Sequence, residues 1–299
     1  MIFVITGATG FIGKALVDYL LMSNHEVYAV SRSEERVRLL WPECCKLHAI
    51  GCEMSDYKDL PKLVAQADVF VHLAWAGTTV EERYSKELQE TNMNATLAAM
   101  VAAKEIGCRM FAASGSQAEY GVNDRILTEN SPCQPEIPYG QAKLDMLCKC
   151  RQLGRAINMP YLHLRICSVF GKGDHSYTLI NTALDKLKRN ESLELTRCTQ
   201  LWNFLYVKDM AYQIERLCTA ILSGTAEPGI YLMASDDTRQ LKSYLVEMKN
   251  VLNSSSELLF GTHKTNSVVS LNPDVTKLKN AIGKITNYTF SQALLDMQL

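Results

Sequence analysis

The start of the chain combines features that few folds accommodate together. Residues 2–5 are a short β-rich run, the segment 6–13 contains three glycines, and apolar residues then recur at helical spacing. In a strand–turn–helix unit, Gly7 permits the tight turn, Gly10 lets the backbone approach a pyrophosphate, and Gly13 lets the helix lie near the strand. The helix N-terminus then faces the phosphates. The segment predicts a dinucleotide-binding unit; the alternative is a structural turn with incidental glycines.

Apolar segments continue to alternate between strand and helix patterns after this unit. Strands are expected at 26–31, 46–50, 69–73, 109–113 and 161–166, with helices at 60–66, 81–106 and 139–157. This alternation predicts an α/β fold with a doubly wound parallel sheet, the Rossmann type.

The strict alternation weakens after residue 170. Helices are expected at 175–189, 209–222 and 241–252 and from residue 290, with short strands at 193–195, 204–207 and 231–233. We predict a dinucleotide-binding core over 1–170, to which the segment 204–222 can return. A smaller C-terminal α/β lobe over 171–299 is expected to be mainly substrate-binding.

Composition excludes several classes of protein. The 299 residues are 47% hydrophobic and 21% charged, with a formal net charge of −1. No concentration of Lys and Arg favours nucleic acid or an anionic membrane, no apolar run is long enough for a membrane span, and residues 1–6 are too short for a secretory signal core. The ten cysteines are scattered, without a paired Cys-x-x-Cys. These features predict a cytoplasmic protein with free thiols and no metal site.

The residues after the second strand bear on the choice of cofactor. An acidic residue there would bind the ribose 2′-hydroxyl of NAD, but the chain has Ser31, Arg32 and Ser33, with Arg36 one turn on. A guanidinium suits a 2′-phosphate. NADP is therefore predicted as the preferred cofactor, with NAD as the alternative if Arg32 is only a solvated loop residue.

Further cofactor-binding residues are expected in the glycine turn and where later strands end. Glu53 and Met54 follow the third strand, where the adenine edge should lie, and a small-residue turn follows the fourth. The complete predicted set is Gly7, Thr9, Gly10, Phe11, Ile12, Arg32, Glu53, Met54, Leu73, Ala74, Trp75, Asn92, Ser114, Tyr139 and Lys143.

Tyr139 and Lys143 form the candidate acid–base pair. A helix can begin at Pro138, which places the two side chains at i and i+4 on one face. An ammonium beside a phenol favours the phenolate, so we expect the pKa of Tyr139 to fall from about 10 toward neutrality. The phenol could then exchange a proton with a reacting hydroxyl or carbonyl. Alone, the Tyr-x-x-x-Lys pattern is weak evidence for catalysis, because a surface tyrosine and a solvated lysine can share a helix by chance.

A polar stretch follows the fifth strand. It runs from Ser114 to Gly121, and functional residues in such sheets gather at the carboxyl ends of strands. A serine hydroxyl here could face Tyr139 across the cofactor. The segment 122–137 is expected to form a loop over the site.

These motifs, in this order, resemble the extended short-chain dehydrogenase/reductase family, in its NAD-dependent epimerase/dehydratase group acting on nucleotide sugars. The segments that carry the resemblance are 6–13, Asn92, Ser116 with Tyr120 and Gly121, Tyr139 with Lys143, Leu164 and Arg165 with Phe170 and Gly171, and 204–209.

The resemblance implies roles for individual residues. Tyr139 would be the catalytic acid/base, and Lys143 would hold the nicotinamide ribose. The catalytic serine maps to Ser116, with Ser114 as the alternative. Asn92 matches a family position, although a polar group inside a helix explains it equally well.

Departures from the family pattern limit which reaction of the family is expected. Dehydratases of the family carry an acidic pair after the catalytic hydroxyl, whereas this chain has Gln117 and Ala118, which disfavours elimination of water. Ser168 stands where many members have a substrate-binding Asn. Trp202 and Asn203 replace an Arg-Asp pair, which puts the usual nucleotide and sugar contacts in doubt.

The segment 115–121 is most similar to members that reduce 4-keto-6-deoxy sugar nucleotides. The resemblance therefore implies an NAD(P)-dependent reductase acting on a nucleotide sugar. The alternatives are a 4-epimerase that retains NAD and a non-catalytic NADP-binding regulator.

A homodimer is also expected from the resemblance. It would form through the two long helices, whose apolar stripe comprises Leu97, Val101, Leu144 and Leu147. A packed core explains this stripe equally well.

Overall fold

The structure is a computed structural model that describes residues 1–77, 79–122, 124–263 and 269–298. Asn123, which falls in the loop predicted over 122–137, lies outside these ranges. No helix within them has both the length and the apolar character needed to cross a bilayer.

A seven-stranded parallel sheet dominates the described chain, in the order β11-β7-β5-β4-β1-β2-β3. Its strands are β1 (Ile2–Thr6), β2 (Glu26–Ser31), β3 (Leu47–Gly51), β4 (Val69–His72), β5 (Met110–Ser116), β7 (Tyr161–Ile166) and β11 (Ile230–Met233). Each neighbouring pair is parallel. The predicted doubly wound Rossmann-type fold is confirmed. Strand order reverses between β1 and β4, and ligands of open α/β sheets bind beside such a reversal.

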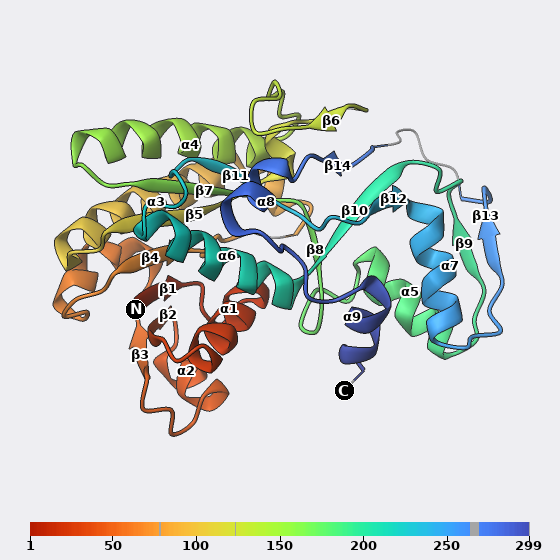
Figure 1. The fold of residues 1–299 in the computed structure, drawn as a ribbon, viewed down its shortest axis with the longest axis horizontal. Coiled ribbons are helices and arrows are strands. Elements are labelled where there is room, and N and C mark those ends of the chain that lie inside the picture. The colour runs from red at the N-terminus through yellow and green to blue at the C-terminus, as the bar shows by residue number, and fades with distance from the viewer. Residues whose placement is uncertain (78, 123, 264–268, 299) are drawn as a thin grey trace.

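Helices cover both faces of this sheet (Figure 1). α3 (Lys86–Ile106), α4 (Pro138–Ala156) and the 3₁₀ helix η1 (Met54–Lys62) pack with one face in a single apolar cluster. α1 (Phe11–Met22), α2 (Glu34–Leu40) and α6 (Val207–Leu222) enclose a second cluster on the other face. The sheet is therefore buried on both sides, which explains why most residues of its strands are apolar.

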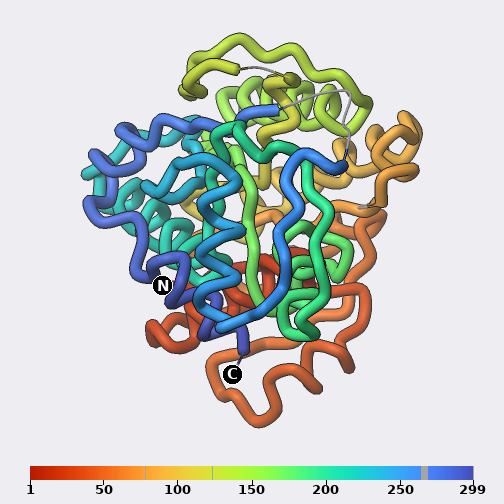
Figure 2. Tube along the Cα trace, turned by 90° about the vertical axis from the view of Figure 1, so that its right-hand side faces the viewer, coloured from red at the N-terminus to blue at the C-terminus, as the bar shows by residue number. Residues whose placement is uncertain are grey.

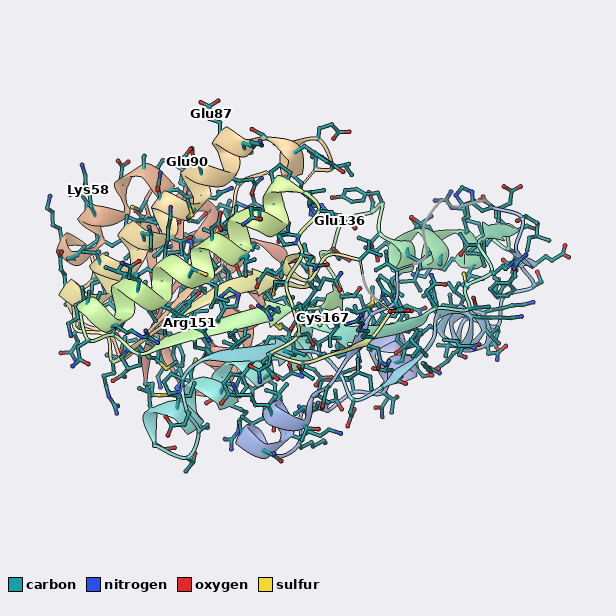
Figure 3. All side chains as sticks on the ribbon, turned by 90° about the horizontal axis from the view of Figure 1, so that it is seen from above. Lys58, Glu87, Glu90, Glu136, Arg151 and Cys167 are labelled. Atoms are coloured by element: carbon teal, nitrogen blue, oxygen red, sulfur yellow. The ribbon has the colours of Figure 1, made fainter. Side chains whose placement is uncertain are left out.

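The stripe considered for a dimer divides between interior and surface. Leu147 of α4 is buried in the cluster shared with α3, whereas Val101 of α3 is 40% exposed. Seen from above, Glu87 and Glu90 of α3 project into solvent (Figure 3). The homodimer stays a prediction.

The C-terminal lobe is built on small sheets and an aromatic core. β8 (Ser168–Phe170), β10 (Leu201–Tyr206) and β12 (Thr238–Gln240) form one sheet, and β9 (Leu193–Leu195) pairs with β13 (Leu258–Phe260). Figure 2 views this lobe from its outer side, where the green β9 and blue β13 segments run side by side. α5 (Leu179–Lys188), α7 (Leu241–Val251) and α9 (Phe290–Asp296) enclose a third apolar cluster.

Late segments also return to the core. α6 packs against α1, β11 extends the large sheet beside β7, and α8 (Thr276–Ile282) packs against both α6 and β11. β14 (Asn272–Pro273) pairs with β6 (Ile126–Leu127), which lies within the segment predicted as a loop. Segments near residues 126 and 272 therefore meet at the same end of the core.

Several predicted element boundaries are wrong. The helix expected at 60–66 is instead η1, because Met54, Tyr57 and Leu60 recur every third residue, the 3₁₀ period. The helix expected from 81 begins at Lys86, because the Ser85 hydroxyl accepts the Leu88 N–H as an N-cap.

Another boundary concerns the end of β5. This strand continues through Ser116, which was expected to lie in the polar stretch after it. The last residues of β5 pair with β7, so the neighbouring strand supplies hydrogen bonds that the local sequence does not reveal. A further helix, expected at 175–189, begins later, at Leu179.

Candidate active site

A cavity of about 1210 Å³ opens at the carboxyl ends of the core strands. Every residue predicted for catalysis or cofactor binding borders it. Glu136 and Cys167 also border it, and Figure 3 places both between the core and the C-terminal lobe. The fold thus brings together residues that are dispersed over most of the sequence.

The glycine turn is packed too closely for side chains. A Cβ on Gly7 would lie 2.7 Å from the Ala74 nitrogen, and one on Gly13 would lie 2.1 Å from the Gly7 oxygen. Around Gly10, by contrast, the nearest atom to an added Cβ is the Gly7 oxygen at 3.2 Å. α1 begins without a side-chain cap and without an acid in its first turn. This bare helix N-terminus beside a glycine cradle fits a dinucleotide pyrophosphate.

The end of β2 carries hydroxyls and guanidinium groups. Thr9 Oγ1 and Ser31 Oγ lie 3.0 Å apart, and Arg32 and Arg36 are exposed at the cavity edge. Glu53 borders the same region from the end of β3. The guanidinium groups are therefore free to meet an anionic ribose substituent.

Asn92 supports the loop after β4. Its Nδ2 donates to the Ala76 carbonyl and its Oδ1 accepts the Ala76 N–H, each at 2.8 Å. In the same loop, Trp75 Nε1 donates to Gln89 at 2.9 Å. Both ends of the Asn92 carboxamide are thus used by protein backbone, and Asn92 positions the cavity wall.

Lys143 is buried, and its ammonium points to the end of β5. Nζ donates to the Ser114 carbonyl at 2.7 Å and to the Ser114 hydroxyl at 3.2 Å. The same ammonium lies 3.4 Å from the centroid of the Trp75 ring. Burial lowers the pKa of Lys143 to about 7, because the charged form loses hydration.

Tyr139 is half-buried beside Lys143 and Arg83. The Lys143 ammonium lies 5.8 Å from the centroid of its ring, and the Arg83 guanidinium lies 5.2 Å from it. Burial raises the pKa of Tyr139, and the opposing effects of the Ser116 side chain and Arg83 do not overcome it. The predicted fall of this pKa toward neutrality is therefore wrong: the Lys143 ammonium donates to Ser114 and not to the phenol.

The two candidate serines occupy different positions. Ser114 accepts from Lys143, whereas the Ser116 side chain interacts with Tyr139. Ser116 ends β5, and its Oγ accepts the Ala118 N–H at 3.1 Å. This separation favours Ser116 as the hydroxyl beside the phenol, and the catalytic assignment stays a prediction.

Sequence reasoning missed several residues that border the cavity. Arg83 precedes the long helix, and His175 follows a glycine loop, so neither belongs to a recognisable motif. Leu271 arrives from a distant segment through the pairing of β14 with β6. Within the described ranges, no group of three or more His, Cys, Asp or Glu side chains is placed to hold a metal, and the ten cysteines are free.

Comparison with known proteins yields a family match and curated relatives. The family described as NAD dependent epimerase/dehydratase matches residues 3–233. The chain is 26% identical over 248 residues to dTDP-6-deoxy-L-talose 4-dehydrogenase (NAD(+)) of Aggregatibacter actinomycetemcomitans, covering 82% of this chain and 88% of that protein. It is 23% identical over 270 residues to dTDP-4-dehydro-6-deoxyglucose reductase of Escherichia coli, covering 86% and 83%.

Solved structures share the fold over the whole chain. UDP-N-acetylglucosamine 4-epimerase from Methanobrevibacter ruminantium M1 superposes with a TM-score of 0.84 at 23% identity, covering 99% of this chain and 96% of that one. UDP-glucuronic acid 4-epimerase from Bacillus cereus, in complex with UDP-glucuronic acid and NAD, gives 0.82 at 20% identity, covering 99% and 98%.

Proposed function

Since the chain belongs to the NAD-dependent epimerase/dehydratase family of extended short-chain dehydrogenases/reductases, we propose that it reduces the 4-keto group of a sugar nucleotide, with a 6-deoxy sugar as the first candidate. The observation that carries this proposal is the shared cavity. Ser116, Tyr139 and Lys143 border the same space as the glycine turn.

The curated relatives support a reaction at the sugar 4-position. Those described above are named as a 4-dehydrogenase of a 6-deoxy-talose nucleotide and a reductase of a 4-dehydro-6-deoxyglucose nucleotide. Gln117 and Ala118 border the cavity beside Ser116, where neither side chain supplies a carboxyl group. The acid pair needed for elimination of water is therefore not at this position, which supports reduction over dehydration.

The chain's own residues supply the proton and hold the reactants. When bound, the nicotinamide cofactor supplies hydride to the carbonyl carbon. The raised pKa keeps Tyr139 protonated near neutral pH, so its hydroxyl can donate a proton to the carbonyl oxygen. The Ser116 hydroxyl would hydrogen-bond the same oxygen, which stabilises negative charge where it develops. Lys143 would hold the nicotinamide ribose.

The test is a panel of nucleotide-linked 4-keto sugars with NADPH or NADH. Optical loss of reduced cofactor should depend on the keto sugar, and the product should be the corresponding alcohol. If the folded protein binds cofactor but turns over no member of the panel, the reductase proposal is wrong.

A 4-epimerase with retained NAD is the second candidate. A curated relative from Methanocaldococcus jannaschii, 27% identical over 221 residues, is named a putative UDP-glucose 4-epimerase. Epimerisation would use the same Ser116, Tyr139 and Lys143, first to oxidise and then to re-reduce one carbon. NAD that remains with the purified protein, together with interconversion of a nucleotide-sugar pair without added cofactor, would favour this function.

We propose NADP as the preferred cofactor, and Arg32→Ala tests it. The guanidinium borders the cavity where a 2′-phosphate would lie, and β2 ends without an acid. Losing one charge-assisted contact of about 1.5–3 kcal/mol should raise the Kd for NADPH roughly tenfold or more and leave that for NADH nearly unchanged. Calorimetric titration with both cofactors measures the two values.

Arg38→Ala is the matched control. Arg38 lies in α2, just after Arg32 in the sequence, but it pairs with Glu34 at 2.6 Å, outside the cavity. It should alter neither affinity. Equal affinities for NADPH and NADH in the unaltered protein, unchanged by Arg32→Ala, would contradict the preference.

A further inference from the structure

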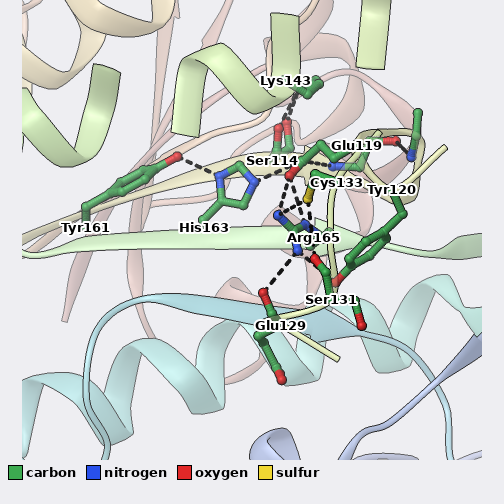
Figure 4. Close-up of polar contacts among 12 residues, drawn as sticks. Ser114, Glu119, Tyr120, Glu129, Ser131, Cys133, Lys143, Tyr161, His163 and Arg165 are labelled. Atoms are coloured by element: carbon green, nitrogen blue, oxygen red, sulfur yellow. Dashed lines mark hydrogen bonds and ion pairs between the residues drawn. The ribbon is translucent and has the colours of Figure 1, made fainter. Parts of the chain in front are cut away.

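A fully buried carboxylate lies behind the candidate serine. Glu119 Oε1 accepts the backbone N–H of Ser116 at 2.7 Å, and Glu119 itself does not border the cavity. Its Oε2 accepts from Arg165 Nε at 2.8 Å, and Arg165 Nη2 lies 2.7 Å from the same oxygen in an ion pair. Figure 4 shows these contacts converging behind the end of β5. Both guanidinium contacts fall on Oε2, which leaves Oε1 for the Ser116 N–H, so the two oxygens of the carboxylate are held from different sides.

His163 completes the support from β7. Its Nε2 lies 2.9 Å from Glu119 Oε1, and its Nδ1 lies 2.7 Å from the Tyr161 hydroxyl. Because a carboxylate only accepts, Nε2 carries the proton and Nδ1 accepts from Tyr161. Burial lowers the pKa of His163, so the ring is neutral near pH 7 and Arg165 alone balances the charge of Glu119.

The backbone between these groups leaves no room for a side chain. A Cβ on Gly115 would lie 2.1 Å from His163 Nε2 and 2.6 Å from Glu119 Oε1. Gly115 pairs with Arg165, and Ser116 pairs with Ile166, across adjacent strands. The position of Ser116 is thus set by a carboxylate on its own chain segment and by the side chains of β7.

The same carboxylate acts on the buried ammonium of Lys143. Lys143 donates to Ser114, a neutral partner, and among the described groups the negative charge of Glu119 is the leading influence that favours its protonated form. Burial would raise the pKa of Glu119, but His163 and Arg165 hold it at about 2, so the carboxylate is charged throughout the neutral range.

The titratable and charged groups that interact electrostatically with Glu119 come from several elements: Cys133, Tyr139, Lys143, Tyr161, His163 and Arg165. Tyr120 contacts Arg165 in turn. Among these described groups, Arg165 is fully charged at neutral pH, whereas Lys143, with a pKa of about 7, is partly charged. Of the two, Arg165 forms a direct ion pair with Glu119.

We propose that Glu119 is a positioning residue for the active site, which holds the backbone of Ser116 and the adjoining end of β5 that receives the Lys143 ammonium. The kinetic part of this inference rests on the proposed function; the part that concerns Lys143 does not. A buried ion pair is by itself weak evidence for stability, so a contribution to unfolding free energy alone would not distinguish the proposal.

Glu119→Gln tests the charge without substrate. The amide oxygen can still accept the Ser116 N–H, but the anion that favours the Lys143 ammonium is gone. The pKa of Lys143, now about 7, should fall by roughly half a pH unit or more. NMR titration of protein with ¹³Cε-labelled lysine measures it, with the resonance assigned from Lys143→Arg.

Asp209→Asn is the matched control. Asp209 is also a buried carboxylate that accepts backbone N–H groups, from Asn287 at 2.7 Å and Tyr288 at 3.3 Å, but it lies in α6 away from the cavity. It should leave the pKa of Lys143 unchanged. An unaltered Lys143 pKa in folded Glu119→Gln would overturn the proposal.

Turnover adds the second readout. In Glu119→Gln, the amide nitrogen that replaces Oε2 faces the Arg165 donors, and this repulsion should shift the carboxamide that holds Ser116. We therefore expect kcat to fall about tenfold to 100-fold with KM little changed. In a plot of kcat against pH, the decline on the alkaline side should also move to lower pH, because Lys143 loses its proton more readily. Glu119→Asp keeps the charge but withdraws it from Ser116, so it should lower kcat without moving this decline.

The outcomes separate the two proposals. If Glu119→Gln does not fold, folded Glu119→Asp still decides: an unchanged kcat overturns the positioning role. A shifted Lys143 pKa together with no turnover by any form of the protein supports the role of Glu119 and counts against the proposed reaction.

Discussion

Replacing Tyr139 with phenylalanine is expected to lower kcat by about 100-fold or more while the protein still binds cofactor. The change removes only the hydroxyl, and a positioned acid typically contributes about 10²–10⁴-fold. The ring remains to fill its place beside Trp75 and under Arg83. Single-turnover kinetics with the keto sugar that the panel identifies would measure the loss at the chemical step.

Tyr84→Phe provides the comparison. Tyr84 also carries a phenol and lies in η2 (Glu82–Tyr84), but it is 58% exposed and does not border the cavity. The kcat of Tyr84→Phe should stay within about twofold of the kcat of the unaltered protein. A loss of less than tenfold in Tyr139→Phe, with folding and cofactor binding intact, would remove Tyr139 from the role of acid.

Gly13→Ala is expected to loosen the dinucleotide site and destabilise the fold. The added methyl would lie 2.1 Å from the Gly7 oxygen and 2.9 Å from the Gly7 carbon, so α1 must move away from β1. Overpacking of this kind costs about 1–3 kcal/mol, against a gain of about 1 kcal/mol because alanine favours helix. The clash is with backbone, which does not relax by rotamer change, so destabilisation should dominate.

Two measurements check Gly13→Ala. The urea midpoint should fall, and the Kd for cofactor should rise about tenfold for each 1.4 kcal/mol lost at the glycine turn. Gly51→Ala is the control, because its Cβ would meet Glu34 at an ordinary 3.4 Å. Unchanged midpoint and affinity in Gly13→Ala would show that α1 does not need its close approach to β1.

Much of the core could be predicted because its determinants are local. The strands at 26–31 and 161–166 have the predicted bounds, since each combines β-prone residues such as Val27, Val30 and Ile166 with turn or loop residues on its N-terminal side. The helix predicted at 139–157 is α4, whose start follows from Pro138 at the first helical position. The candidate site residues could be predicted as well, because they follow the carboxyl ends of parallel strands, and these ends meet at one edge of the sheet.

Other features depend on segments far apart in the sequence. The pairing of β6 with β14 joins residues near 126 and 272, and β11 joins the large sheet beside β7. Neither two-residue strand has enough length to show an alternating pattern. Such contacts form when distant segments pack together, and the hydrophobic periodicity of a single short segment carries no information about them.

The amino-acid order by itself determined the strand–glycine–helix unit, the Rossmann-type sheet and the family, because these depend on spacing that is written along one segment at a time. Only the tertiary structure decided the charge state of the site. It turned the Lys143 ammonium toward Ser114, raised the pKa of Tyr139 by burial, and placed Glu119 between Arg165 and Ser116. Hydration and electrostatic partners are properties of the folded surroundings, so these effects appear only when distant strands and helices enclose the same group.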